Sequence, residues 1–143
     1  MEPNIGINQM SMVAGQLSIL LQRQFSLFHL ARLAHWNVTG PNFSELHEIL
    51  FKKAYELFEA TLDDTAERIR QLGGMVYPLI LDEAQFNPSV ERILESIETC
   101  IRFMRSDVYP TISEVGDYGG QTLIGQQMAD YEKLAWQLRS TIE

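Results

Sequence analysis

The sequence predicts an all-α protein, a single domain over residues 1–143 that folds as a four-helix bundle with a long central crossover. Apolar residues recur every three or four positions almost throughout the chain, which is the spacing of an amphipathic helix. Proline and glycine interrupt this spacing at only a few places. No alternating Val/Thr-rich run indicates a strand, and the length is that of one domain. An ordinary up-down bundle without a functional site shows the same helix spacing, so the spacing alone does not separate the two architectures.

The first two helices are separated by Thr39-Gly40-Pro41, which interrupts the helical spacing. We expect the first helix over residues 6–37. Its buried face is marked by one apolar stripe: Leu17, Leu21, Phe25 and Phe28. Asn42 and Glu45 have the spacing of a capping box, so the second helix is expected to begin there. It should run to about Leu72, where Gly73-Gly74 ends it.

The central connection is expected over residues 75–88, which contain Pro78 and Pro88. Within it, the apolar run Leu79-Ile80-Leu81 is expected to form a short helix. The connection is long enough to return the chain to the end of the bundle from which the second helix began. It therefore predicts a crossover rather than a tight hairpin between the second and third helices.

The third helix is expected to begin near Ser89, and Pro110 should kink it or end it early. Glycines mark the break before the last helix: Gly116, Gly119 and Gly120. Apolar stripes define both helices, the third by Ile93, Ile97, Cys100, Ile101, Met104 and Val108, and the fourth by Ile124, Met128, Tyr131, Ala135 and Leu138. Cys100 is the only cysteine, and its place in the stripe predicts a small core residue rather than a reactive thiol.

The composition favours a cation as the partner. The formal net charge is −8, and no run of Lys or Arg occurs, so direct binding to DNA is not expected. No apolar run has the length of a membrane span, and no membrane association is expected. The N-terminus lacks the basic start and apolar core of a signal peptide. With a single cysteine there is no internal disulfide, so a cytoplasmic location is expected.

Four residues are candidate metal ligands: His35, His47, Asp63 and Glu67. Asp63 and Glu67 lie one helical turn apart and share a face, and a bound cation would compensate their charges. Taken singly, the acids also fit a solvated helix face with Arg68 and Arg70 as partners, and each histidine fits a structural role. Together they form a nitrogen and oxygen ligand set suited to iron or zinc.

Helix geometry restricts how these ligands can meet. His47 and Asp63 are sixteen residues apart on the predicted second helix. That separation is about 24 Å along the axis, with a rotation of roughly 160°. One straight helix cannot bring both to one metal ion. If all four residues serve one site, His35 and His47 come from one subunit and Asp63 and Glu67 from its neighbour, which predicts a symmetric oligomer.

Two sequence blocks carry a family resemblance. His-Trp-Asn-Val-Thr-Gly-Pro-x-Phe-x-x-Leu-His-Glu begins at His35, and Ala-Glu-Arg-Ile-Arg-x-Leu-Gly-Gly ends at Gly74. Together with residues 131–139 they resemble the Dps miniferritins, the DNA-protection-during-starvation family of ferritin-like proteins. The resemblance implies a ferritin-like bundle, a homo-dodecameric shell and a ferroxidase site shared between two-fold-related subunits. It also implies iron storage, oxidation of Fe(II) to Fe(III) by peroxide or dioxygen, and protection against oxidative stress, with zinc as a substitute metal.

The chain departs from the family pattern at one expected ligand. The family places an acid four residues after the second histidine, where this chain has Phe51. Counting back from Asp63 instead puts Lys52 at that position, because the interval from His47 to Glu67 is one residue longer than usual. We expect the helix to absorb the extra residue as a π-bulge between His47 and Tyr55. A metal position built from His35, Asp63 and Glu67 would then survive, and a second position near His47 would be weak.

This departure leaves alternatives to the ferroxidase interpretation. One is a shell that sequesters metal with little or no oxidation. A DNA-compacting scaffold is disfavoured by the charge, and a di-iron oxygenase would need its carboxylates inside one bundle core. The resemblance also suggests Asp117, with Asp130, as pore-lining acids. Trp36 is expected to be a core residue at the end of the first helix, and His29 to be structural.

Overall fold

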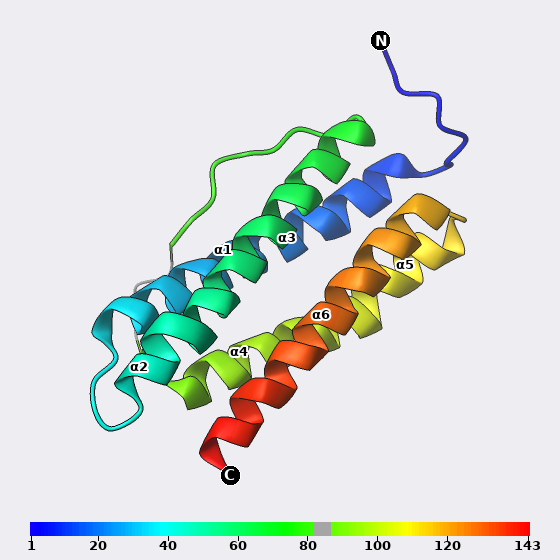
Figure 1. Ribbon diagram of the computed structural model, residues 1–143. Coiled ribbons are helices and arrows are strands. Elements are labelled where there is room, and N and C mark those ends of the chain that lie inside the picture. Colours follow the sequence, from blue (N-terminus) through cyan, green and yellow to red (C-terminus); the bar gives the residue numbers. More distant parts are fainter. Residues whose placement is uncertain (82–86) are drawn as a thin grey trace.

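Four helical arms pack as two antiparallel pairs in the computed structural model, which describes residues 1–81 and 87–143 (Figure 1). The first pair consists of α1 (Met10–Asn37) and the arm made of α2 (Phe43–Glu45), a π-helical turn (Leu46–Leu50) and α3 (Phe51–Gln71). The second pair consists of the arm made of α4 (Val90–Phe103), a second π-helical turn (Met104–Val108) and α5 (Tyr109–Glu114), and of α6 (Tyr118–Ile142). The all-α four-helix bundle is confirmed, and the described residues contain no strand.

The helix boundaries follow the sequence with two exceptions. α1 begins at Met10 rather than at residue 6, because Gly6 and Gln9 have left-handed backbone angles, with φ of 76° and 63°. The predicted capping box does not form, since the Asn42 side chain accepts no capping hydrogen bond. The stop of α3 is as predicted. Gly73 is left-handed, with φ of 89°, and the N–H of Gly74 bonds to the Ile69 carbonyl at 2.9 Å, as in a Schellman motif.

The described first part of the crossover, residues 75–81, leaves the end of α3 and runs along the outer side of α1 (Figure 1). Residues 75–81 contain no helical turn, so the short helix expected at Leu79-Ile80-Leu81 does not form there. Residues 82–86, the rest of the central part of this connection, lie outside the described residues. Gln22 of α1 fixes the crossover by two hydrogen bonds to the backbone of Ile80: its Nε2 donates to the carbonyl at 2.6 Å, and its Oε1 accepts from the N–H at 3.0 Å.

Pro110 does not end the third arm, although the regular α-helix of α4 stops at Phe103. The predicted kink at Pro110 stays a prediction. The π-helical turn Met104–Val108 lies directly before it, and α5 continues with Pro110 in its first turn. A proline lacks the N–H that an α-helix needs, and its ring clashes with the carbonyl four residues earlier. The wider π-helical turn relieves this clash, and the first turn of a helix needs no N–H from proline.

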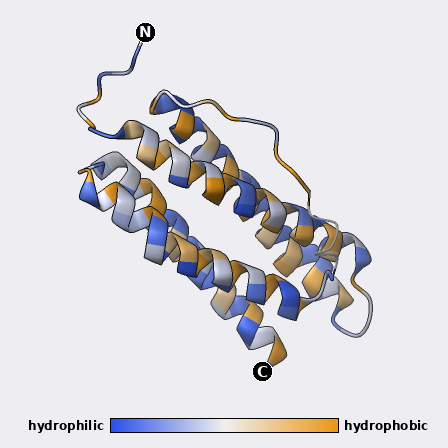
Figure 2. Cartoon of the chain, turned by 180° about the vertical axis from the view of Figure 1, so that it is seen from behind, coloured by the Kyte–Doolittle hydropathy of each residue, from blue (hydrophilic) through white to orange (hydrophobic). Residues whose placement is uncertain are grey.

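Hydrophobic residues recur along every helix, interleaved with hydrophilic ones (Figure 2). The core between the pairs is aliphatic and aromatic, with Phe58 and Tyr131 among its largest buried side chains. It also contains a neutral polar network in which Gln24 donates to Gln127 at 2.8 Å, and Thr61 and Tyr131 share a hydrogen bond of 2.5 Å. This network joins α1, α3 and α6. In the described ranges no helix is both long and apolar enough to cross a bilayer.

Candidate metal site

His35 and His47 form a stacked pair where the end of α1 meets the first π-helical turn. Their ring centroids are 3.9 Å apart and the ring planes differ by 10°. The Nδ1 of His35 is 2.8 Å from the His47 carbonyl oxygen, and the Nδ1 of His47 is 2.6 Å from the His35 carbonyl oxygen. A carbonyl oxygen only accepts, so each Nδ1 carries the proton and donates it. In the neutral ring, each Nε2 therefore has a free lone pair that can bind a metal ion.

Aromatic side chains and one cation surround the histidine pair. Phe43 stacks on the His47 ring at a centroid distance of 4.9 Å, and Tyr55 meets the His35 ring edge-on at 5.1 Å. The Arg32 guanidinium lies over the Tyr55 ring at 3.9 Å. None of these three neighbours was predicted from the sequence. The i, i+3 spacing of Arg32 and His35 on one helix was the available signal for the arginine.

Asp63, Asp64 and Glu67 form an exposed acidic cluster on α3. Ligand oxygens from the three side chains all lie within 4.8 Å of one another. The negative charge of Asp63 raises the pKa of Glu67 above its ordinary value, and desolvation, the hydrogen bond that protonated Glu67 donates to Asp63 and the charge of Asp64 act in the same direction. Mutual repulsion of this kind is relieved by a bound cation.

The arginines that the sequence offered as partners for these acids are engaged elsewhere. Arg68 donates to Asp117 at 2.5 Å, and Arg70 donates to the Gly74 carbonyl at 2.7 Å. Among the ion pairs formed by residues 1–81 and 87–143, none joins either arginine to Asp63 or Glu67. The interpretation of a solvated helix face neutralised by Arg68 and Arg70 is therefore not favoured.

One subunit keeps the two halves of the predicted ligand set apart. His35 and His47 are brought together at the α2 end of the first pair, whereas Asp63 and Glu67 lie toward the far end of α3 (Figure 1). Sixteen residues of helix between His47 and Asp63 correspond to about 24 Å. The structure thus divides the predicted ligands into two groups, and their union into one site between two subunits stays a prediction.

The structure decides which residue stands at the place of the absent acid. The π-helical turn Leu46–Leu50 lies where the extra residue was expected to be absorbed. Phe51 is 1% exposed and belongs to the core. The side chain of Lys52 is 54% exposed, and its Nζ lies 3.9 Å from a carboxylate oxygen of Glu56. Lys52, rather than Phe51, therefore occupies the solvent-facing position one turn after His47.

The described residues do not place the carboxylates of a di-iron centre inside the bundle core. The buried polar or charged residues in the described part of the chain are Gln24, Thr61, Thr65, Asp117 and Gln127. Asp117, the only charged one, pairs with Arg68 and accepts from the Gly120 N–H at 2.9 Å, which caps α6. It is fully buried, so the pore-lining role suggested for it is wrong. Trp36 is 62% exposed and is not the core residue that was expected.

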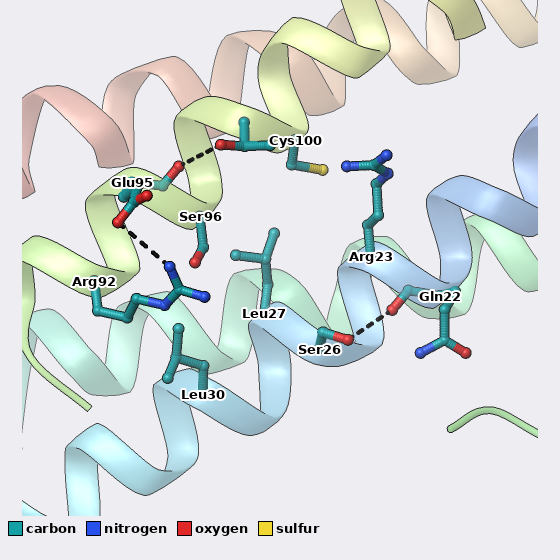
Figure 3. A pocket seen from close by; sticks show the side chains of 10 residues that line it. Gln22, Arg23, Ser26, Leu27, Leu30, Arg92, Glu95, Ser96 and Cys100 are labelled. Atoms are coloured by element: carbon teal, nitrogen blue, oxygen red, sulfur yellow. Dashed lines mark hydrogen bonds and ion pairs between the residues drawn. The ribbon is translucent and has the colours of Figure 1, made fainter. Parts of the chain in front are cut away.

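A pocket of about 460 Å³ opens between α1 and α4 and contains none of the four predicted ligands (Figure 3). Arg92 pairs with Glu95 at 3.3 Å at one end, and Arg23 extends toward Cys100 at the other. Cys100 is buried, and burial raises its pKa to about 12, with the charge of Arg23 partly opposing the rise. The prediction that Cys100 is a small core residue is confirmed, and a thiol with a raised pKa is expected to react slowly.

Comparison with known proteins places this chain in a family. The ferritin-like domain model matches residues 14–143. A low temperature-induced protein of Nostoc sp. is 32% identical over 157 aligned positions, covering 98% of this chain and 86% of that protein. The DNA protection during starvation protein of Mycolicibacterium smegmatis is 30% identical over 145 positions, covering 91% and 79%. The chain therefore belongs to the Dps family of ferritin-like proteins.

The fold comparison agrees. The crystal structure of the Dps protein from Vibrio cholerae O1 superposes with a TM-score of 0.86 and 24% identity, covering 100% of this chain and 98% of that chain. That protein is described as a member of a broad superfamily of ferritin-like diiron-carboxylate proteins. The ferritin-like bundle expected from the sequence is confirmed.

Proposed function

We propose that this protein assembles into a shell that binds, oxidises and stores iron, with Fe(II) as the substrate and peroxide or dioxygen as the oxidant. The observation that carries the proposal is the histidine pair, in which both Nδ1 atoms are bonded to carbonyls and both Nε2 atoms are left to bind a cation. Ligating imidazoles in metal sites commonly donate their second N–H to a carbonyl in this way. Membership of the Dps family supports iron as the metal.

The site is proposed to form between two subunits related by a two-fold axis. His35 and His47 of one subunit would face Asp63 and Glu67 of the other, so each interface would contain the site twice. The crowded carboxylates supply the negative charge that the histidine half lacks. That charge is needed because the Arg32 guanidinium, which lies over Tyr55 near the histidines, would repel a cation. A closed dodecamer, as the family resemblance implies, would enclose a cavity for the ferric product.

The chain's own residues bind and orient the metal, and the electron transfer belongs to iron and the oxidant. Each Fe(II) loses one electron, and peroxide or dioxygen is reduced. The imidazole Nε2 atoms and the carboxylates favour this step because they stabilise the higher positive charge of the Fe(III) product. Consumption of Fe(II) together with peroxide would limit hydroxyl-radical formation, which is the proposed route to protection against oxidative stress.

Lys52 favours a second candidate, a shell that sequesters metal and oxidises it slowly. Its ammonium group stands one turn after His47, where a carboxylate would complete a second metal position. A positive charge there repels a metal ion, so the position near His47 is expected to bind weakly. Direct DNA binding is not part of either candidate, because the net charge of −8 opposes it, and a gel shift at low and moderate salt would test that.

Iron oxidation by the purified apo-assembly separates the two candidates. The protein is mixed anaerobically with Fe(II), peroxide or air is added, and ferric absorbance is followed. An Asp63→Ala/Glu67→Ala variant should lose rapid oxidation. A Glu91→Ala/Glu95→Ala variant, which removes two acids at the same spacing from α4, should keep it. Oxidation by the parent that is no faster than that of the Asp63/Glu67 variant would reject a ferroxidase and leave the sequestering shell.

Mixed assemblies test the shared site. Subunits carrying His35→Ala/His47→Ala are co-assembled with equal amounts of subunits carrying Asp63→Ala/Glu67→Ala. If the site is shared, each mixed pair restores one of its two sites, so random mixing should recover about one quarter of the parent activity. A site contained within one subunit would recover none.

A further inference from the structure

We propose that the π-helical turn Leu46–Leu50 is a positioning device for His35, acting through the backbone carbonyl of His47. In an α-helix that carbonyl would accept the N–H of Phe51, four residues later. Here the Phe51 N–H bonds to the carbonyl of Leu46 instead. The His47 carbonyl has therefore lost its usual donor, and the Nδ1–H of His35 takes that place at 2.8 Å.

The reciprocal bond, from His47 to the carbonyl of His35, also uses a backbone oxygen that lacks its helical donor. The last carbonyls of α1 lack intrahelical donors, as at any helix end. The Val38 N–H bonds to Ala34, so that carbonyl is already paired. The next carbonyl, that of His35, accepts the Nδ1–H of His47 at 2.6 Å. Two backbone oxygens that lack their α-helical donors thus set the tautomer of both rings.

The turn also determines where the His47 side chain lies. α3 buries Phe51, Ala54 and Phe58 at helical spacing. An uninterrupted α-helix in this register would place His47 one turn before Phe51, on the core stripe. The structure buries Leu46 and Leu50 instead and leaves His47 half-buried. The burial of adjacent Leu50 and Phe51 marks the one-residue shift that turns His47 out of the core and onto the His35 ring.

The extra residue is therefore part of the site. Fixing Nδ1–H on both rings leaves both Nε2 lone pairs for a cation, whereas a ring free to take the other tautomer would present them only part of the time. The consequence for metal affinity rests on the proposed function. The positioning of the rings does not, because it is a property of the protein without metal.

The test removes the turn and keeps the core. Ile49 is 63% exposed, and its deletion places the Lys52 N–H four residues after His47, so that an α-helical hydrogen bond can form. Leu46 then lies one turn before Phe51 and stays on the core stripe. The matched control is Ile49→Ala, which changes the same side chain but retains the residue.

The first readout is solid-state ¹⁵N NMR of histidine-labelled apo-protein, since the chain has only three histidines. A His29→Gln background leaves the pair alone in the spectrum. The parent and Ile49→Ala should show Nδ1–H at both rings, and the deletion should convert His35 to a mixture with Nε2–H. If the deletion variant does not fold, the parent still provides a test, because an Nε2–H tautomer at either ring of the neutral pair would overturn the inference.

The second readout is Zn²⁺ affinity of the apo-assembly by calorimetry. The deletion should weaken binding roughly 10- to 100-fold, the usual effect of losing a hydrogen-bond partner of a ligand, and Ile49→Ala should not. Unchanged tautomers in a folded deletion variant would overturn the positioning role. A tautomer shift without Zn²⁺ binding by the parent would support the positioning role and count against the proposed function.

Discussion

Replacing Lys52 by Asp should strengthen metal binding, whereas replacing its neighbour Phe51 by Asp should prevent folding. Both changes introduce the acid that the family pattern has and this chain lacks. Lys52 is 54% exposed and pairs only with Glu56 at 3.9 Å, so its replacement should change the unfolding free energy by no more than about 0.5 kcal/mol. Phe51 is 1% exposed, and loss of its ring alone should cost about 3–5 kcal/mol before the penalty of burying a carboxylate.

The gain in affinity can be estimated from charge. Changing a unit positive charge to a negative one at about 5 Å from a divalent cation is worth about 3 kcal/mol in water. Screening at physiological ionic strength reduces this to about 2 kcal/mol, or roughly thirtyfold in affinity. Calorimetric titration of the apo-assembly with Zn²⁺ measures it, with iron oxidation as a parallel assay.

Lys53→Asp is the matched control, because Lys53 is also exposed and carries the same charge on a different face of α3. If Lys53→Asp raised the affinity as much as Lys52→Asp, the effect would be one of overall charge, and the assignment of Lys52 to the second metal position would be refuted. A folded Phe51→Asp variant with the higher affinity would refute it equally.

Three further outcomes are expected from the structure. Asp117→Ala should lower the unfolding free energy by about 3–5 kcal/mol in urea titrations, because it leaves the Arg68 guanidinium without its buried partner. Asp63→Asn should lower the pKa of Glu67 toward its ordinary value in a carboxyl ¹³C titration, since the Asp63 charge is the largest cause of the rise. The same repulsion affects stability. As pH falls through the raised pKa of Glu67, protonation of Glu67 relieves its repulsion with Asp63 in the folded state and stabilises the fold. This gain in stability at low pH should be smaller in the Asp63→Asn variant. At a pH of about 8.5, the pKa of a free thiol, Cys100 should resist thiol reagents in the folded protein and react once the protein is unfolded.

The sequence by itself determined most of the helical architecture. Helical spacing is a local property, and so are the Gly73 stop of α3 and the Ser89 cap of α4, whose side chain accepts from the Arg92 N–H at 3.1 Å. The π-bulge after His47 could also be predicted, because the interval from His47 to Glu67 is one residue longer than the usual spacing of the family. The candidate ligands followed from residue type together with the family resemblance.

Only the tertiary structure decided which side chains face the site. The sequence left Phe51 and Lys52 as equal candidates for the position of the absent acid, and packing in the core settled the choice by burying the Phe51 ring. The burial of Asp117 required a partner 49 residues away, and the pairing of His35 with His47 required two backbone carbonyls that lacked their usual donors. These outcomes depend on contacts between residues distant along the chain and on which backbone groups remain unpaired, and helical periodicity encodes neither.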